Sequence, residues 1–282
     1  MSAIDISHLT KAFASGILAN DDINLNVNQG ECFCLLGPNG AGKSTLINQI
    51  TTELKPTKGN IRVLGIDVAL KPAEAKKMMG IMPQDCGMFE HLTVKQHIKI
   101  FSKLKEISGR DCVRNIITSL KLDEHKNKKI GELSFGLKKQ VLLATALLGS
   151  PPVLILDEPG TGLDPEARRN VWAMLKEKKK EGTTILLSTH QLEEAEYMSD
   201  RVGIISSGKI RHLGTISSLS ATLKNRFELK MKKVSDQTQI TKYFEDIGTA
   251  VDFIRMKKID GFSLATISLE NVYFELLGSN RY

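Results

Sequence analysis

The sequence predicts an α/β fold with a mostly parallel sheet, followed by a small α+β appendage. Short apolar runs of strand length alternate with helical segments through most of the chain, a pattern typical of parallel sheets. After about Gly214 the pattern changes to half-exposed strands and short helices. We place the boundary near Thr222, so that the expected domains span residues 3–222 and 223–282.

Two kinds of strand are expected in the first third of the chain. Residues 23–27 alternate apolar and polar side chains, as a half-buried strand does. Residues 32–36 are continuously apolar and stop at Gly37, which favours a strand buried on both faces. The other elements expected here are a helix over residues 43–53, a strand near 61–64 and a helix over 93–105 with Thr93 as its N-cap.

The middle of the chain is more sharply marked. Ser134 is suited to cap a helix that runs to Gly149, and two prolines at 151 and 152 end it. An apolar run at residues 153–156 predicts a buried strand. Next come a helix that opens at Asp164 and Pro165 and closes at Gly182, and a buried strand over residues 185–187.

In the appendage, residues 227–232 alternate cleanly and predict a half-exposed strand. Ile240, Tyr243, Phe244 and Ile247 have helical spacing and indicate a short amphipathic helix. We expect a further strand near residues 264–269 and a helix near 269–277.

Charge and composition exclude several classes of protein. The net charge is +7, but the basic residues are scattered, and the densest run, residues 176–180, reads as a solvated helix face. Aromatic residues make up 5% of the chain, too few for a platform that stacks single-stranded nucleic acid, so no nucleic-acid partner is expected.

Cysteine usage and the absence of export signals favour a reducing compartment. The four cysteines, Cys32, Cys34, Cys86 and Cys112, form neither a C-x-x-C pair nor a zinc-ligand pattern. The first residues lack the basic and apolar regions of a signal peptide, and the longest apolar stretch, residues 141–148, is too short to span a membrane. We expect a chain that lies in or faces the cytosol.

A phosphate-binding motif follows the apolar strand and opens a helix. It fits G-x-x-x-x-G-K-[ST], in which glycines let backbone N–H groups converge on phosphate oxygens. Lys43 is expected to reach the β- and γ-phosphates, and the Ser44 hydroxyl to bind Mg²⁺. The expected nucleotide-binding residues of this segment are Gly37, Pro38, Asn39, Gly40, Ala41, Gly42, Lys43 and Ser44.

A pair of carboxylates follows the second buried strand. Asp157 stands at the strand's carboxyl end, where an aspartate can hold Mg²⁺ or its water. Glu158 is one residue further, where a carboxylate can polarise the attacking water. The pair predicts hydrolysis of the bound nucleotide.

The order of these motifs resembles the ATPase cassette of ABC transporters. Gly37–Thr45 resembles its Walker A motif, and Asp157 and Glu158 its Walker B motif. The other matching positions are Gln84 in the Q-loop, Leu133, Ser134, Phe135, Gly136 and Leu137 in the signature, Asp164 in the D-loop, the switch histidine His190, and Phe13 where an aromatic residue stacks on adenine.

The resemblance implies a P-loop cassette fold with a mostly parallel sheet core, an antiparallel β subdomain and a helical subdomain. It also implies catalysis by Lys43, Glu158 and His190, and Mg²⁺ held by Ser44, Gln84 and Asp157. Two cassettes, as a homodimer or heterodimer, would enclose two ATP molecules, with the signature completing the partner's site. A fused or separate transmembrane domain would provide the transport pathway at the cytoplasmic face of a membrane.

Three residues depart from the family pattern: Phe135 and Leu137 replace Gly and Gln of the signature, and Gly160 replaces a Thr. The segments at 204–214 and 268–274 resemble the lipid-exporting A subfamily and bacterial drug and sodium exporters, which suggests export of a lipid or amphipathic compound. Two alternatives stay open: a binding-only degenerate cassette in a heterodimer, and a non-transport ABC ATPase.

Overall fold

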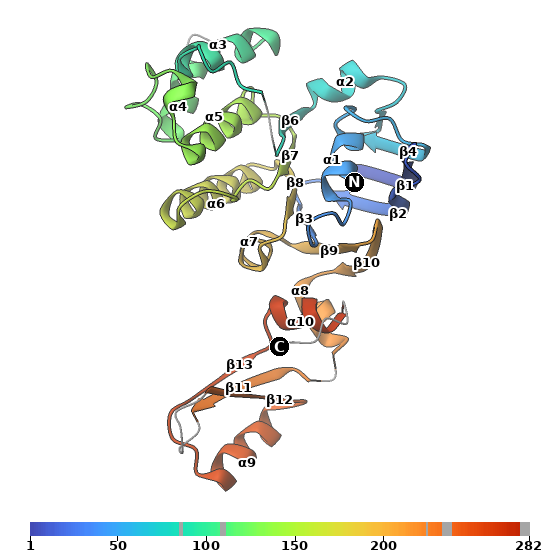
Figure 1. The fold of residues 1–282 in the computed structure, drawn as a ribbon, viewed down its shortest axis with the longest axis vertical. Helices are drawn as coiled ribbons and strands as arrows, with labels where there is room; N and C mark the ends of the chain where they lie inside the picture. Colours follow the sequence, from blue (N-terminus) through green and yellow to red (C-terminus); the bar gives the residue numbers. More distant parts are fainter. Residues whose placement is uncertain (85–86, 108–110, 224, 233–238, 277–282) are drawn as a thin grey trace. The chain divides into compact units, whose positions relative to one another are not determined.

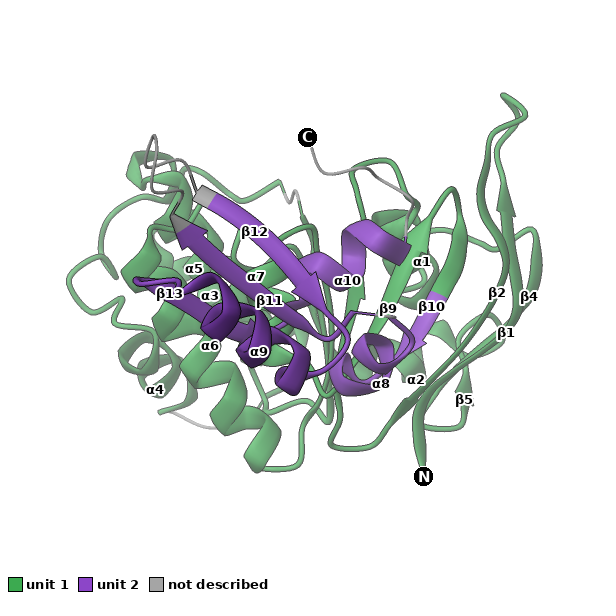
Figure 2. Cartoon of the chain, turned by 90° about the horizontal axis from the view of Figure 1, so that it is seen from below, with its two compact units in different colours: residues 1–211 green, residues 212–282 purple. Residues whose placement is uncertain are grey.

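The computed structural model describes residues 1–84, 87–107, 111–223, 225–232 and 239–276. The chain divides into two compact units, Met1–Arg211 and His212–Tyr282, which Figure 2 shows in green and purple. The functional boundary expected near Thr222 remains a prediction.

A six-stranded sheet forms the centre of the first unit, and its edge strand β10 continues past Arg211 into the second unit. Its order is β10-β9-β3-β8-β7-β6, and the pairs β9·β3, β3·β8, β8·β7 and β7·β6 are parallel. Each residue of β3, β7 and β8 is buried, because these apolar runs are covered on both faces. The strands are β3 (Cys32–Leu36), β6 (Met79–Met82), β7 (Val153–Asp157), β8 (Thr184–Thr189), β9 (Arg201–Ser206) and β10 (Lys209–Gly214).

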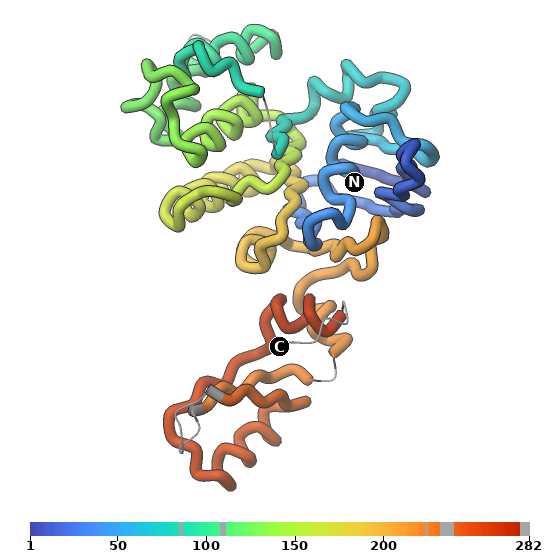
Figure 3. Tube along the Cα trace, viewed as in Figure 1, coloured from blue at the N-terminus to red at the C-terminus, as the bar shows by residue number. Residues whose placement is uncertain are grey.

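This sheet confirms the predicted parallel α/β core. The helix predicted to open at Asp164 and Pro165 is α6 (Pro165–Lys180), and Asp164 caps it by accepting a hydrogen bond from the N–H of Ala167 at 2.9 Å. The other connecting helices are α1 (Lys43–Ile50), α2 (Pro72–Lys77) and α7 (Leu192–Met198), and their path is followed most easily in Figure 3.

A second, antiparallel sheet packs against the core. Its order is β2-β1-β4-β5, from β1 (Ser2–Ala12), β2 (Leu18–Asn28), β4 (Lys58–Val63) and β5 (Ile66–Asp67). Its inward side chains, among them Ile4 and Val63, share one apolar cluster with Phe33 of β3 and Leu46 of α1. The cluster fixes the sheet beside the strand and the helix that flank the phosphate motif.

A group of helices lies on the side of the central sheet that faces away from β1, β2 and β4, and its helix α5 contacts β6 (Figure 1). It contains α3 (Val94–Leu104), α4 (Cys112–Ser119), the 3₁₀ turn η1 (Ile130–Glu132) and α5 (Phe135–Leu147). Thr93 and Gln96 form a reciprocal capping box at the start of α3. Ser134 caps α5, since its Oγ accepts a hydrogen bond from the N–H of Leu137 at 3.4 Å.

The second unit is α+β, as predicted. Its sheet has the order β12-β11-β13, with both pairs antiparallel. Its elements are α8 (Ile216–Ala221), β11 (Phe227–Lys232), β12 (Gln239–Phe244), α9 (Ile247–Lys257), β13 (Phe262–Thr266) and α10 (Leu269–Leu276). Position 277, the expected end of the last helix, lies outside the described residues.

One secondary-structure prediction is wrong. The residues at 240, 243 and 244, expected in a helix, lie in β12, and the helix α9 begins only at Ile247, after the cap Asp246. The helical spacing was genuine, but β-branched and aromatic residues at 240–244 also suit a strand. Pairing with β11 along its whole length decides in favour of the strand.

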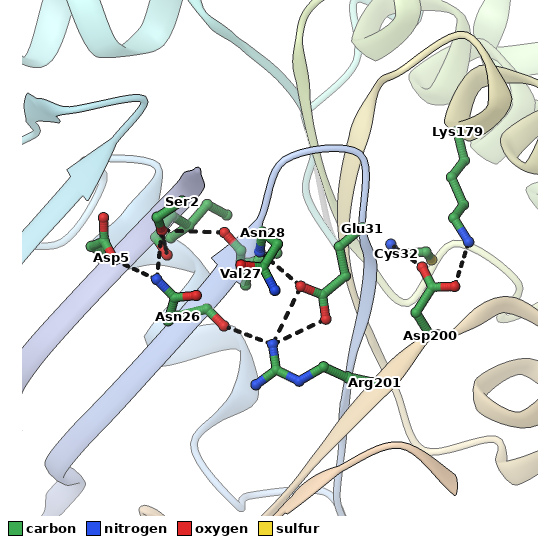
Figure 4. A network of polar contacts seen from close by, with 11 residues as sticks. Ser2, Asp5, Asn26, Val27, Asn28, Glu31, Cys32, Lys179, Asp200 and Arg201 are labelled. Atoms are coloured by element: carbon green, nitrogen blue, oxygen red, sulfur yellow. Dashed lines mark hydrogen bonds and ion pairs between the residues drawn. The ribbon is translucent and has the colours of Figure 1, made fainter. Parts of the chain in front are cut away.

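A polar network joins the two sheets of the first unit (Figure 4). Arg201, in the first position of β9, donates to both carboxylate oxygens of Glu31 at 3.1 and 3.3 Å and to the backbone oxygen of Asn26 in β2 at 3.2 Å. Its neighbour Asp200 accepts a hydrogen bond from the N–H of Cys32, the first residue of β3. The network therefore ties β2, β3 and β9 together at one edge.

We predict that Arg201→Met lowers the free energy of unfolding by roughly 2–3 kcal/mol, because it leaves the Glu31 carboxylate buried without its partner. The exposed pair Lys71–Glu74 supplies the control: Lys71→Met should change the free energy by less than about 0.5 kcal/mol. Urea unfolding of the three proteins measures both values. Equal losses in the two variants would contradict this account of the network.

Candidate nucleotide-binding site

The phosphate motif forms the tight loop between β3 and α1. Gly42 caps α1 in the left-handed region, with φ of 105°, and a Cβ there would lie 2.3 Å from the backbone oxygen of Ala19. A Cβ on Gly37 would lie 2.4 Å from the backbone oxygen of Ile205. Backbone from β2 and β9 thus approaches the loop so closely that only glycine fits at either position.

Lys43 lies under this loop rather than in solvent. Its side chain is 5% exposed, and its Nζ donates to the backbone oxygens of Gly37 at 2.8 Å and Pro38 at 3.1 Å. Burial lowers the pKa of this ammonium group, while the carboxylates of Glu158 and Asp157 oppose that shift. The loop therefore surrounds a cation that is aimed at its centre.

Glu158 lies opposite Lys43, at the end of β7. Its Oε1 is 3.8 Å from the Nζ of Lys43 and 3.1 Å from the Nδ1 of His190, which follows β8. Its Oε2 accepts a hydrogen bond from the hydroxyl of Thr161 at 3.1 Å. The backbone of Glu158 has φ of 52°, a conformation that a non-glycine residue adopts at some cost and that recurs at functional sites.

The three residues expected to hold Mg²⁺ offer only oxygen ligands. The hydroxyl of Ser44 donates to Oε1 of Gln84 at 3.3 Å, so these two side chains already meet. Asp157 is 2% exposed and its carboxylate accepts a hydrogen bond from the Ser188 hydroxyl. A hydroxyl, an amide oxygen and a carboxylate beside a phosphate loop suit the hard cation Mg²⁺.

A cavity of about 440 Å³ opens above the loop. It joins the first segment of β2, the phosphate loop, Gln84, Glu158 and the turn between β9 and β10. Its lining residues are Ile17, Leu18, Ala19, Asn39, Gly40, Gly42, Lys43, Ser44, Thr45, Gln84, Glu158, Ser207 and Gly208. The charged end of the cavity is therefore Lys43 and Glu158, and its apolar end is Ile17 and Leu18.

Some residues expected from the sequence lie apart from this cavity. Phe13 is 40% exposed in the turn between β1 and β2, with the Lys11 ammonium 5.3 Å from its ring centre, and it does not line the cavity. Ser134 and Phe135 lie at the start of α5, and Asp164 caps α6. The signature and the D-loop thus lie outside the cavity of their own chain.

Several contacts of the site escaped the sequence analysis. Ser188 receives the backbone N–H of Glu158 on its carbonyl oxygen, 3.1 Å away, and bonds Asp157 through its hydroxyl. Asn20 donates to the backbone oxygen of Gly42 at 3.1 Å and accepts from Gln49 at 2.7 Å. Ser188 lies in β8, two residues before His190. No local signal marked Asn20, because its role depends on β2 reaching the loop.

Gly42→Ala should destabilise the protein more than Gly40→Ala does. Both glycines have positive φ, but a Cβ meets the Ala19 oxygen at position 42 and no described atom within 4 Å at position 40. We expect Gly40→Ala to cost about 1 kcal/mol and Gly42→Ala at least about twice as much. Thermal unfolding without nucleotide compares the two, and equal costs would show that the Ala19 contact is not limiting.

Comparison with known proteins agrees with this geometry. A model of the family described as ABC transporter matches residues 20–161, about half of the chain. ABC transporter A family member 7 of Arabidopsis thaliana is 37% identical over 236 residues, covering 82% of this chain and 25% of the plant protein. The Nod factor export ATP-binding protein I of Rhizobium sp. (strain N33) is 38% identical over 211 residues, covering 73% of this chain and 69% of the relative.

Solved structures show the same fold. One described as the ATP-binding subunit of an ABC transporter covers 98% of this chain and all of that one, with a TM-score of 0.76 and 25% identity. A dimeric ATP-binding cassette in a post-hydrolysis state, bound to ADP and Pi, covers 75% of this chain and 98% of its own, with a TM-score of 0.70 and 25% identity.

The chain spans about a quarter of the length of the plant A-family proteins that it matches. Within the described residues, no helix is both long and apolar enough to cross a membrane. The family match, the relatives and the shared fold establish that the chain belongs to the ABC transporter family and has the fold of its ATP-binding cassettes.

Proposed function

We propose that the chain is the motor of an ABC exporter, which binds and hydrolyses ATP to drive transport through a membrane domain. The observation that carries the proposal is the cluster of Lys43, Glu158 and His190 at the phosphate loop. Glu158 lies within 4 Å of both Lys43 and His190 at the charged end of the cavity. This arrangement brings a phosphate-binding cation, a base and an orienting group to one place.

Nucleotide binding uses the loop and the start of α1. Backbone N–H groups of the loop and the positive end of the helix dipole favour the phosphates, and the Lys43 ammonium compensates the charge of the β- and γ-phosphates. Ser44, Gln84 and Asp157 would hold Mg²⁺, which shields the phosphate oxygens when it is bound. Ile17 and Leu18 would supply an apolar wall for the adenine ring of the nucleotide. Phe13 remains a further candidate for stacking on that ring.

Hydrolysis needs a water aligned with the γ-phosphate, because most of the rate in phosphoryl transfer comes from positioning and charge stabilisation. Glu158 is the group that would accept a hydrogen bond from that water and draw off its proton. His190, 3.1 Å from the same carboxylate oxygen, holds the carboxylate on the phosphate side and can contact the γ-phosphate itself. Lys43 would stabilise the charge that develops on the phosphoryl oxygens.

The second half of each site would come from a partner cassette. Ser134 caps α5, so this helix presents its N-terminus and the residues Ser134, Gly136 and Leu137 away from the chain's own cavity. A helix N-terminus favours an anion such as the γ-phosphate of a neighbouring copy. The dimeric cassettes among the solved relatives support this arrangement.

A transmembrane domain would receive the work of the dimer at the cytoplasmic face of a membrane. We propose residues 86–103, after Gln84, as its contact. Cys86 lies outside the described residues, whereas Phe89, in the segment that precedes α3, is 46% exposed. The Rhizobium relative is named for export of Nod factor, and the plant relatives belong to the A family. From these relatives we propose that the exported cargo is a lipid or another amphipathic compound.

The altered signature keeps one alternative open, a cassette that binds ATP but does not hydrolyse it as a homodimer. Phe135 stands where the family has glycine and is 55% exposed, so its ring can crowd the partner's nucleotide. In that case the chain would bind ATP but depend on a different cassette for hydrolysis. The intact Lys43, Glu158 and His190 cluster supports the catalytic reading over this binding-only one.

The test is the steady-state ATPase rate of the purified chain over a range of protein concentrations. A composite site predicts a rate that rises faster than linearly with concentration, since two copies must meet. Glu158→Gln should lower the rate by at least about 100-fold, because it removes the base without changing the size of the side chain.

A rate in the wild type equal to that of Glu158→Gln at every concentration would contradict hydrolysis by a homodimer. The binding-only alternative attributes the lack of hydrolysis to the Phe135 ring, and the variant Phe135→Gly tests this. Under it, Phe135→Gly should restore a rate that depends on Glu158, whereas under the catalytic reading Phe135→Gly leaves an already measurable rate in place.

A further inference from the structure

A buried carboxylate lies just behind the catalytic cluster without belonging to it. Glu194, in the first turn of α7, is 0% exposed and follows His190 by four residues. Its Oε1 accepts a hydrogen bond from the indole N–H of Trp172 in α6 at 2.9 Å. A charge this deep in the fold is costly, which indicates that its position matters.

The carboxylate of Glu194 occupies the space that a side chain at position 160 would need. Gly160 is buried and does not adopt a positive φ, so its backbone alone would accept alanine. A Cβ there would lie 2.5 Å from Oε1 of Glu194 and 3.3 Å from Cδ of Arg168. If the Glu194 carboxylate moved to make room, it would give up its hydrogen bond with the Trp172 indole, and no solvent reaches the site to replace that bond.

Gly160 lies two residues after Glu158, in the loop that holds the catalytic carboxylate. Glu194 itself belongs to the segment that starts with His190. Arg168 also holds that segment, because it donates to the side chains of Gln191 at 3.3 Å and Glu193 at 3.1 Å. Glu194 is therefore in contact with one catalytic segment and part of the other.

We propose that Glu194 is a positioning residue for ATP hydrolysis, which acts through Gly160 on Glu158 and through the first turn of α7 on His190, and so keeps these two side chains in contact. The inference rests on the proposed function. Gly160 and Glu194 form a size-matched pair: the missing side chain at 160 leaves the space that the carboxylate fills.

Electrostatics agrees with this placement. Burial raises the pKa of Glu194, while the Thr189 hydroxyl, Trp172 and Arg168 oppose the shift. Glu158 is the acidic neighbour that adds to it. Thr189 lies in β8, Trp172 and Arg168 lie in α6, and Glu158 follows β7, so three segments converge on this one carboxylate.

The test is a set of substitutions at the two positions. Gly160→Ala should lower kcat at least about tenfold with KM for ATP changed by less than about twofold, since misplacing a catalytic group by ~1 Å costs up to ~100-fold in rate. Glu194→Asp in the same chain shortens the acid by one methylene and should recover most of the lost kcat. Glu194→Gln keeps the length of the side chain and should not rescue Gly160→Ala.

Trp172 is the chain's one tryptophan, so its emission reports the Glu194 contact directly. Gly160→Ala should change the emission, and the double variant with Glu194→Asp should change it in a different way, because the acid then withdraws from the indole. Melting temperatures of all variants separate these effects from unfolding.

Equal kcat in Gly160→Ala and the wild type, or equal rescue by Asp and Gln, would overturn the proposal. Loss of folding in Gly160→Ala that Glu194→Asp repairs and Glu194→Gln does not would support the size match. A wild type without ATPase activity above Glu158→Gln would instead reject the proposed function, and the emission series would then decide the contact by itself.

Discussion

The pairing of one buried carboxylate with two basic side chains governs the site. Glu158 is 5% exposed, and a carboxylate withdrawn from water costs several kcal/mol unless hydrogen bonds and opposite charges replace the water. Its partners, Lys43 and His190, come from segments more than 30 residues away on either side, and reach it because β3, β8 and β7 are adjacent parallel strands. Parallel strands end at the same edge, so three short motifs that are far apart in sequence meet there. The phosphate loop, the second carboxylate Asp157 and the Ser188 bridge are arranged around this edge.

Close approach of neighbouring atoms is the second constraint on the glycines, beside the positive φ of Gly42 and Gly162. Gly37 and Gly42 are limited by backbone oxygens of residues 205 and 19, and Gly162 by the ring of Phe135, whose Cε1 would lie 2.3 Å from a Cβ at that position. The last contact bears on the altered signature. The ring of Phe135 packs on the loop that precedes Asp164 in its own chain, so in the proposed dimer part of the extra bulk would be accommodated there.

Much of this could be predicted from the sequence, because the decisive signals are local. Three features are predicted by signals that lie within about ten residues of sequence. They are the glycine-rich loop after an apolar strand, the capped helix at Ser134 and the Asp-Glu pair after residues 153–156. The helix expected at 240–247 failed for a non-local reason: Ile240 and Phe244 suit either period, and pairing with β11 decided between them. The roles of Asn20, Glu194 and Gly160 could not be predicted either, since each depends on contacts between segments 22 or more residues apart.

The most direct measurement of the central claim is a single turnover of bound ATP. Radiolabelled ATP and Mg²⁺ are mixed with excess protein, the reaction is stopped at intervals, and the bound nucleotide is separated into ATP and ADP. Our account predicts that the wild type converts its bound ATP, that Glu158→Gln and His190→Ala bind as much ATP but retain it unhydrolysed, and that Lys43→Ala binds little. Conversion by Glu158→Gln at the rate of the wild type would contradict the account, because the water would then be activated by a group other than the carboxylate between Lys43 and His190.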